Sequence, residues 1–256
     1  MIDSRAIVSP RAELAVDVSV GPYSIIGPGV HIGARTVIGP HAVINGPTTL
    51  GADNRVFQFA SLGDEPQDKK HQGESTRLEI GDHNVFRESC TINRGTARDK
   101  AVTRIGNDNL FMAFSHVAHD CVIGHHTVFA NCASLGGHVE IGDWAILGGL
   151  TAVHQFSRIG AHAFLGGGSI VSRDVPPYVM VAGNPAVPHA VNVEGLKRRG
   201  FTEDQIKNIR EAYRILYRSD LKLADAVTRL APLLPTAPEL QIFVDFIQSS
   251  MRSLVR

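Results

Sequence analysis

Histidine residues crowd into one stretch of the chain. Seven of the 12 histidines lie between His116 and His162, and the segment SHVAHDC places His116, His119 and Asp120 close together. A neutral imidazole near pH 7 is the natural general base, and a neighbouring carboxylate can orient it. The grouping therefore predicts acid–base chemistry, although a single histidine at a surface corner is more often merely solvated. The solvated interpretation is favoured for three of them: His125, His126 and His162.

A regular spacing decides which of these residues can meet. If three six-residue units close one turn of the chain, residues 18 apart lie above one another at about 4.8 Å. Gly137 and Gln155 then share the column of His119, and His138 lies one coil above Asp120. The residues expected to converge on one edge of the molecule are His119, Gly137, His138, His154 and Gln155.

The six-residue period is carried by large apolar residues. It runs through residues 2–62, 80–92 and 105–171, usually with a small residue two positions earlier and often with glycine next. An α-helix has no period of six, and an ordinary β-sandwich would need many coincidences of spacing. The pattern therefore predicts an all-β solenoid, a parallel β-helix of hexapeptide repeats.

Two stretches interrupt the repeat, and it stops near Pro185. Residues 64–77 and 95–104 are expected to form loops on one face of the solenoid, often the binding face. We predict the β-helix over residues 1–186 and a small C-terminal α-helical domain over residues 187–256. That domain would cover the unpaired strand edges of the last coil.

The helical domain shows ordinary helix signals. A short helix is expected between Asn192 and Gly200, and Thr202 with Gln205 forms a capping box for an amphipathic helix. A third helix is expected over residues 223–230 and a fourth from about Pro238. The apolar stripe of the fourth helix is expected to consist of Leu240, Phe243, Ile247, Met251 and Leu254.

Composition excludes several classes of protein. Lys and Arg (25) balance Asp and Glu (25), which argues against an electrostatic nucleic-acid binder. No apolar stretch reaches membrane-spanning length, and the first ten residues have no signal-peptide core, so no membrane insertion is expected. Three cysteines form no paired framework, which favours a reducing cytoplasm.

Motifs along the entire chain resemble one enzyme family, the acyl-carrier-protein:UDP-N-acetylglucosamine O-acyltransferases of lipid A biosynthesis. The most specific is NVEGLKRRGF at 192–201, outside the repeat. The others are the hexapeptide run itself, the QD…K…GE.TR loop (67–77), INRGT (92–96), HVAHDC (116–121), GGHVEI (136–141), TAVHQF (151–156), DVPPY (174–178) and GNPA (183–186). The resemblance implies a left-handed β-helix, an exception to the right-handed crossover rule. It also implies a homotrimer with active sites in the clefts between subunits.

The resemblance also implies roles for individual residues. His119 would be the general base that takes the proton from the glucosamine 3-hydroxyl, and Asp120 would orient it. The backbone N–H of Gly137 would stabilise the oxyanion. Since adjacent strand residues point to opposite faces, the pairing of His119 with Asp120 requires a bend at this corner.

The remaining implied contacts concern substrate and chain length. The sugar pocket would consist of His116, His138, His154 and Gln155. Loop contacts to the sugar and the acyl hydroxyl would come from Gln67, Asp68 and Lys70. Nucleotide contacts would come from Asn192, Glu194, Arg198 and Arg199, although a KRR run alone is usually a solvated face. Gly167, with no side chain, would set the acyl length and admit a 3-hydroxymyristoyl-class donor.

The expected partners are acyl carrier protein and UDP-N-acetylglucosamine. No metal or cofactor is expected, since the donor is carried on the phosphopantetheine of the carrier. Two departures from the family pattern occur. Asn93 stands where TIHRGT usually has histidine, and the loop at 67–77 reads QDKKHQGESTR where QDLKY.GEPTR is commoner.

Three other classes of protein share part of this sequence pattern. A gamma-class carbonic anhydrase shares the β-helix and binds zinc across a subunit cleft, here with ligands from His116, His119, His138 and His154. It would not need the GLKRRGF domain. The later N-acyltransferase of lipid A synthesis has a further N-terminal domain, and a scaffold solenoid would not explain the histidine column.

Overall fold

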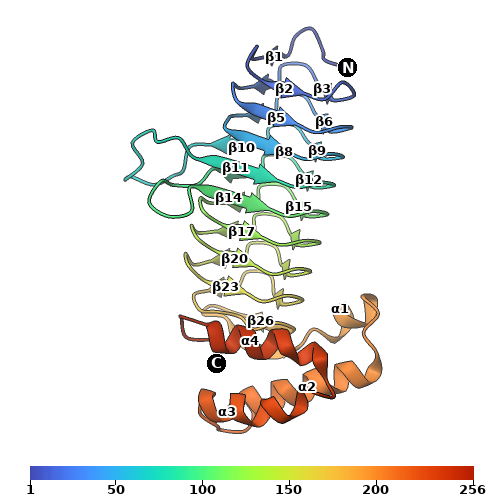
Figure 1. Ribbon diagram of the computed structural model, residues 1–256, viewed down its shortest axis with the longest axis vertical. Helices are drawn as coiled ribbons and strands as arrows, with labels where there is room; N and C mark the ends of the chain where they lie inside the picture. The colour runs from blue at the N-terminus through green and yellow to red at the C-terminus, as the bar shows by residue number, and fades with distance from the viewer.

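The computed structural model describes residues 1–256. The chain winds into a tall, three-sided, left-handed parallel β-helix. The C-terminal helices cover the end formed by its last coil (Figure 1). The predicted fold class is confirmed. Two loops, residues 65–76 and 94–101, project from the same side of the prism where the repeat is interrupted.

Three sheets form the faces of the prism, and each is named here after one of its strands. The nine-stranded β16 sheet consists of β1 (Ile7–Val8), β4 (Ile25–Ile26), β7 (Val43–Ile44), β10 (Ser61–Asp64), β13 (Thr91–Asn93), β16 (His116–Val117), β19 (Ser134–Leu135), β22 (Ala152–Val153) and β25 (Ile170–Val171). The eight-stranded β17 sheet consists of β2 (Glu13–Leu14), β5 (Val30–Ile32), β8 (Thr48–Leu50), β11 (Arg77–Ile80), β14 (Val102–Ile105), β17 (Val122–Ile123), β20 (Glu140–Ile141) and β23 (Arg158–Ile159). The ten-stranded β15 sheet consists of β3 (Ser19–Val20), β6 (Val37–Ile38), β9 (Arg55–Val56), β12 (Val85–Phe86), β15 (Leu110–Phe111), β18 (Val128–Phe129), β21 (Ile146–Leu147), β24 (Phe164–Leu165), β26 (Val179–Ala182) and β27 (Val187–Val191).

The register follows the expected period of 18 residues. His116 pairs with Ser134, and Ser134 pairs with Ala152, in parallel register. The period lengthens only at the two loops, where Ser61 pairs with Thr91 and Thr91 with His116. The two loops thus project from the β-helix, and the strands on either side of each loop keep the same pattern of inward-facing residues.

The core is a column of large inward side chains with small residues at the corners. The rings of Phe86, Phe111 and Phe129 lie above one another with centroids 4.9 and 4.7 Å apart. Ala133 and Cys121 occupy buried corner positions where a larger side chain would not fit. This packing buries at least one aliphatic or aromatic side chain in most strands, which is the main stabilising contribution.

Corners turn through residues with left-handed backbone geometry. The φ angle is 59° at Asp120, 63° at His138 and 65° at Phe156, and none of the non-glycine residues with positive φ is β-branched. We name the three edges of the prism after residues on them. The His119 corner joins β16 to β17, the Trp144 corner joins β20 to β21, and the Leu150 corner joins β21 to β22.

The outward faces of the three sheets differ in polarity. The β17 sheet presents charged side chains, including Glu79, Arg104, Glu140 and Arg158, which form ion pairs along the face. The outward positions of the β15 sheet are mainly Val, Leu, Ile, Phe and Met, and those of the β16 sheet are uncharged except for Asp64 and one histidine. The Leu150 corner, where these two sheets meet, exposes four large apolar side chains: Tyr23, Phe59, Phe114 and Leu150.

The C-terminal segment begins as a strand. β27 turns back antiparallel onto β26, so residues 187–191 extend the β15 sheet and the first helix starts at Val193. The helices are α1 (Val193–Arg198), α2 (Glu203–Tyr217), α3 (Leu223–Leu230) and α4 (Gln241–Ser249), with 3₁₀ turns at Ala231–Leu233 and Pro238–Leu240. The capping box of Thr202 and Gln205 is present.

One prediction for the last helix is wrong. Met251 does not pack on its apolar stripe but is 96% exposed, because α4 ends at Ser249. The chain then runs extended along the His119 corner, where the backbone N–H of Asp174 donates to the carbonyl oxygen of Ser253. Leu254 is buried by this docking and not by a continuing helix.

Candidate active site

A histidine–aspartate pair lies at the corner between β16 and β17. The Nδ1 of His119 donates to Oδ2 of Asp120 over 2.9 Å, and the Asp120 side chain is fully buried. The positive φ of Asp120 supplies the bend that the pairing requires, because it breaks the alternation of side chains along a strand.

Asp120 is held by more than the imidazole. It accepts hydrogen bonds from the backbone N–H of Thr96 (3.0 Å) and from its hydroxyl (2.6 Å). Burial alone would raise the pKa of Asp120, but the hydrogen bonds from His119 and Thr96 outweigh it and lower the pKa below its usual value. The carboxylate stays ionised, which keeps the proton on Nδ1 of His119 and leaves Nε2 free to act as a base.

Gly137 lies directly against the His119 ring. A Cβ at this position would approach Cε1 and Nε2 of His119 to 2.5 and 2.7 Å, closer than any side chain can tolerate. The backbone N–H of Gly137 donates to no acceptor in the chain. A glycine therefore both admits the imidazole and leaves an N–H donor beside its reactive nitrogen.

These residues open onto a hollow of about 470 Å³. Six of the predicted site residues line it together: Gln67, His116, His119, Gly137, His154 and Gln155. Nδ1 of His116 lies 2.7 Å from the hydroxyl of Thr91, and burial lowers the pKa of His116, which favours the neutral ring. Nδ1 of His154 donates to the carbonyl oxygen of Gln155 over 3.0 Å.

A second cleft, of about 610 Å³, lies on the other side of His138. The His138 ring stacks on Phe156 (centroids 4.4 Å apart) and meets His119 edge to face at 5.0 Å. Asp68 and Lys70 line this second cleft and not the first hollow. So do residues that the sequence pattern did not single out, namely Thr96, Arg98, Asp99, Lys100, Phe156 and Arg252. The 18-residue spacing from His138 could have identified Phe156.

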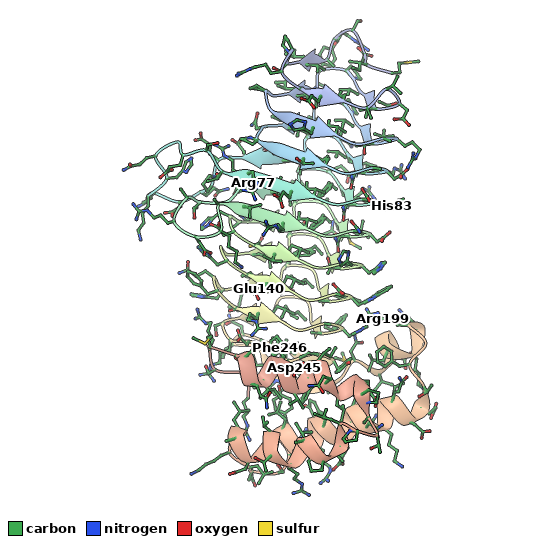
Figure 2. All side chains as sticks on the ribbon, in the orientation of Figure 1. Arg77, His83, Glu140, Arg199, Asp245 and Phe246 are labelled. Carbon is green, nitrogen blue, oxygen red and sulfur yellow. The ribbon has the colours of Figure 1, made fainter.

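The four predicted nucleotide-binding residues lie on another edge, at the Trp144 corner. Figure 2 shows Arg199 on the opposite side of the prism from the two loops. Arg199 lies over the Trp144 ring (5.2 Å) and donates to its carbonyl oxygen over 2.8 Å. Asn192 is buried, caps α1 and donates to the carbonyl oxygen of His162, whereas Glu194 and Arg198 are exposed.

His162 is not the solvated corner residue that we expected. Its ring stacks on Tyr178 (5.5 Å), and its Nδ1 lies 3.1 Å from Nη1 of Arg199. Burial, with a smaller effect from Arg199, lowers the pKa of His162 to about 4. The docking of α1 onto this corner explains the difference, because no periodicity within the solenoid encodes it.

Gly167 lies on the third edge, the Leu150 corner. An added Cβ would have Gly149 as its nearest neighbour, at 3.3 Å from the carbonyl oxygen, so the position is open. The predicted base, nucleotide contacts and length determinant therefore occupy three different corners of one chain.

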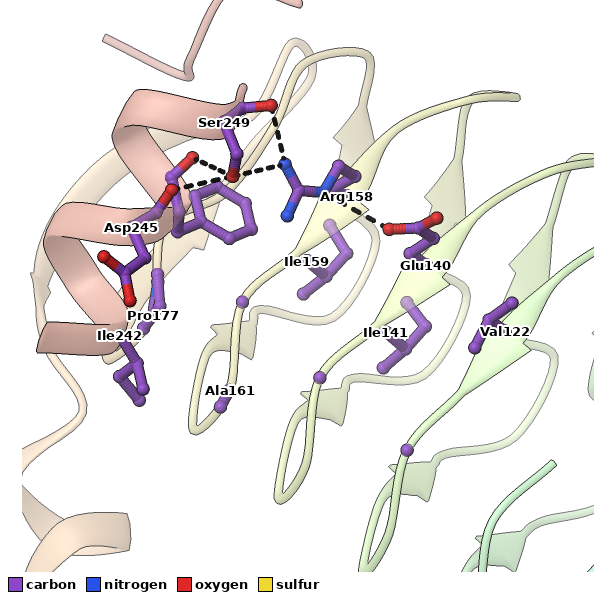
Figure 3. A pocket seen from close by; sticks show the side chains of 14 residues that line it. Val122, Glu140, Ile141, Arg158, Ile159, Ala161, Pro177, Ile242, Asp245 and Ser249 are labelled. Carbon is purple, nitrogen blue, oxygen red and sulfur yellow. Dashed lines mark hydrogen bonds and ion pairs between the residues drawn. The ribbon is translucent and has the colours of Figure 1, made fainter. Parts of the chain in front are cut away.

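A further groove, of about 400 Å³, separates the β17 sheet from α4 (Figure 3). Apolar side chains of Ile141, Ile159 and Phe246 line it, and Arg158 crosses its end, over the Phe246 ring at 4.7 Å. Arg158 also pairs with Glu140 and donates to Ser249. None of the predicted site residues lines this groove.

The four histidines considered as zinc ligands do not form one cluster within the chain. Only His119, Asp120 and His138 bring ligand atoms within 4.8 Å of one another. His116 and His154 face the first hollow.

Comparison with known proteins connects this geometry with a family. Residues 174–255 match the family described as UDP N-acetylglucosamine O-acyltransferase, domain 2, and residues 17–46 and 103–137 match the bacterial transferase hexapeptide. The acyl-[acyl-carrier-protein]–UDP-N-acetylglucosamine O-acyltransferase of Thiobacillus denitrificans is 56% identical over 100% of this chain and 99% of its own. The chain belongs to this family. Carbonic anhydrase, the later N-acyltransferase and the scaffold solenoid are thereby set aside.

Solved structures of the family have the same fold. The UDP-N-acetylglucosamine O-acyltransferase of Moraxella catarrhalis superimposes with a TM-score of 0.98 at 47% identity, covering 100% of this chain and 99% of that one. The Acinetobacter baumannii protein gives 0.97 at 46% identity, with the same coverage. No helix of the chain combines the length and the apolar character needed to cross a membrane.

Proposed function

We propose that this protein transfers a (3R)-3-hydroxyacyl chain from acyl carrier protein to the 3-hydroxyl of UDP-N-acetylglucosamine, the first step of lipid A biosynthesis. The names of its full-length relatives support the donor and acceptor. The observation that carries the chemistry is the pair of His119 and Asp120, which lies against Gly137 at the edge of an open hollow.

The reaction follows from this arrangement. Nε2 of His119 takes the proton from the sugar 3-hydroxyl as that oxygen attacks the thioester carbonyl carbon. The negative charge that develops on the carbonyl oxygen is stabilised by the N–H of Gly137. The carbon–sulfur bond then breaks, and the proton on His119 passes to the departing thiolate, which yields the ester and the free carrier thiol. Asp120 stabilises the imidazolium between these two transfers.

The polarity of the faces supports a homotrimer. Two adjacent outward faces are uncharged or apolar apart from Arg55 and Asp64, and they meet at a corner with exposed aromatic and aliphatic side chains. The third face carries rows of ion pairs. A threefold axis beside the Leu150 corner would pack the β15 sheet of one copy against the β16 sheet of the next. The charged β17 sheet would remain in solvent.

The same packing would complete the site. It places the His119 corner of one copy across a cleft from the Trp144 corner of its neighbour. Arg198 and Arg199 could then contact the diphosphate of a nucleotide whose sugar lies at His119. Gly167, on the Leu150 corner, would face the same cleft and admit a long acyl chain of the 3-hydroxymyristoyl class.

No metal or cofactor is needed for this mechanism, and we place the reaction in the cytoplasm. Three free cysteines suit a reducing compartment. Exhaustive chelation should leave the transferase rate unchanged, and activity that is lost on chelation and restored by zinc would contradict this expectation.

The decisive experiment is mass spectrometry of the product formed from UDP-N-acetylglucosamine and a panel of acyl carrier proteins with different acyl chains. The expected product is the 3-O-(3-hydroxyacyl) sugar nucleotide, with the highest yield from 3-hydroxymyristoyl donors. No ester product from any donor would overturn the proposal.

A further inference from the structure

A second histidine–carboxylate pair lies beside the first. Nδ1 of His138 is 2.7 Å from Oδ2 of Asp99, and the side chains are 16% and 43% exposed. The first pair, His119 with Asp120, is only one edge-to-face ring contact away, at 5.0 Å. Two imidazoles therefore border the site, and each has its Nδ1 engaged by a carboxylate.

Asp99 belongs to an inserted loop and not to the repeat. The loop at 94–101 is fastened at its start, where Thr96 donates twice to Asp120, and near its end, where Nζ of Lys100 pairs with Glu140 at 3.1 Å. Between these two points Asp99 reaches His138. One short segment thus contacts the carboxylate of the first pair and supplies the carboxylate of the second.

The other carboxylates near His138 are engaged elsewhere. Asp120 lies within 4.8 Å but accepts from Thr96 and His119. Glu140, two residues further along the chain, is engaged by Lys100 and by Arg158 (3.3 Å). The opposite face of the His138 ring is covered by Phe156. Stacking therefore fixes the plane of the ring. The contact with Asp99 fixes which ring nitrogen carries the proton.

We propose that Asp99 is a positioning residue that holds His138 with Nδ1 protonated, so that Nε2 is an obligatory hydrogen-bond acceptor at the site. This inference rests on the proposed function for its substrate: the acceptor would take a hydrogen bond from a hydroxyl of the sugar nucleotide. An unrestrained imidazole could present either a donor or an acceptor, whereas the pair selects an acceptor.

The proposal is tested first without activity. ¹⁵N NMR of the histidine side chains in the full-length protein at neutral pH should show a protonated Nδ1 and an unprotonated Nε2 for His138. Asp99→Ala should convert this signal to a mixture of tautomers. A wild-type protein with a proton on Nε2 of a neutral His138, or a variant with an unchanged signal, overturns the proposal whatever reaction the protein catalyses.

Kinetics form the second test, with a matched control on the same loop. Asp99→Ala should raise the KM for UDP-N-acetylglucosamine by about three- to tenfold, the scale of one hydrogen bond, with the KM for the acyl donor unchanged. Lys100→Ala removes the neighbouring ion pair with Glu140 but leaves Asp99 in place, so the tautomer signal of His138 should stay as in the wild type. An equal change of the His138 signal in the two variants would show that the loop acts only as a structural clasp and would overturn the positioning role.

Discussion

The buried carboxylate of Asp120 connects the fold with the chemistry at the scale of single residues. It accepts from a backbone N–H and a hydroxyl of Thr96 and from the ring of His119. A carboxylate so fixed can orient a base without losing its charge, because its partners lower its pKa. The position was identified from the sequence, whereas its attachment to Thr96 in the inserted loop was not.

His119→Ala should lower the transferase rate by about 10²–10⁴-fold, since it removes the proposed general base. Asp120→Asn should cost less, because the imidazole remains but its charged form is less stabilised. The measurement is steady-state turnover, with circular dichroism to verify the fold. His31→Ala is the control, because His31 is exposed on the β17 sheet and distant in register. A His119→Ala variant with wild-type turnover would remove the residue from the mechanism.

Gly167→Met should shorten the preferred acyl chain. If Gly167 lies at the end of the acyl groove, a side chain there would exclude the terminal methylenes, each worth about 0.8 kcal/mol when buried. The variant should lose activity with the long donor and gain it with a donor several methylenes shorter, as measured by kcat/KM across a donor series. An unchanged donor preference in a correctly folded variant would refute this role.

His162 should make the stability of the protein depend on pH. Its pKa falls from 6.5 to about 4 on folding, so between these values the unfolded chain binds the proton more readily than the folded one. Stability should therefore decrease as the pH is lowered from 6.5 towards 4. His162→Gln should flatten this part of the profile in denaturant titrations, whereas His125→Gln, an exposed residue on the same corner, should not. Parallel profiles for wild type and His162→Gln would contradict the expectation.

At the scale of elements, successive coils are joined by a ladder of buried asparagine side chains, which the hydrophobic period does not predict. Asn54, Asn84 and Asn109 are buried above one another, each accepting from the backbone of the next coil. They span the coils that carry the two loops, where the repeat is interrupted. Amide ladders of this kind satisfy corner backbone groups that would otherwise be unpaired.

Asn84→Ala should lower the free energy of unfolding by about 1–3 kcal/mol, because it leaves buried partners without hydrogen bonds. The partners are the carbonyl oxygens of Asp82 and Gly106 and the side chain of Asn109. Chemical denaturation is the measurement. Gln248→Ala, which truncates an exposed amide on α4, is the control and should change stability by less than about 0.5 kcal/mol. A loss no greater than that of the control would show that the ladder is dispensable.

At the scale of the whole molecule, one chain holds the parts of the proposed site on separate edges. The His119 corner and the Trp144 corner are joined by the charged β17 sheet and face different directions. In the proposed trimer, the base of one copy and the arginines of its neighbour would reach the same ligand. The proposed assembly would therefore contribute to the chemistry as well as to stability.

Mixing two inactive variants should restore activity. His119→Ala and the double variant Arg198→Ala, Arg199→Ala each lack one side of the proposed shared site. After co-refolding, about a quarter of the sites in randomly mixed trimers would combine an intact His119 with intact arginines from the neighbour. Activity at low UDP-N-acetylglucosamine concentration measures this. Recovery no greater than the sum of the two separate variants would place the site within one chain.

The period of the sequence by itself determined the solenoid, its inward faces and the column that contains His119, Gly137 and Gln155. It could do so because each residue of a β-helix contacts the one 18 positions away, so local spacing encodes the register. The capping box of Thr202 and Gln205 also depends only on neighbouring residues, so the sequence predicted the start of α2 as well.

Tertiary structure alone decided where the segments outside the repeat dock and which residues they contact. The loop placed Asp99 on His138, α1 brought Arg199 onto Trp144 and His162, and the C-terminal segment turned Met251 into solvent. These contacts join parts of the chain whose relative positions follow from docking of whole surfaces, and no spacing within either part specifies them.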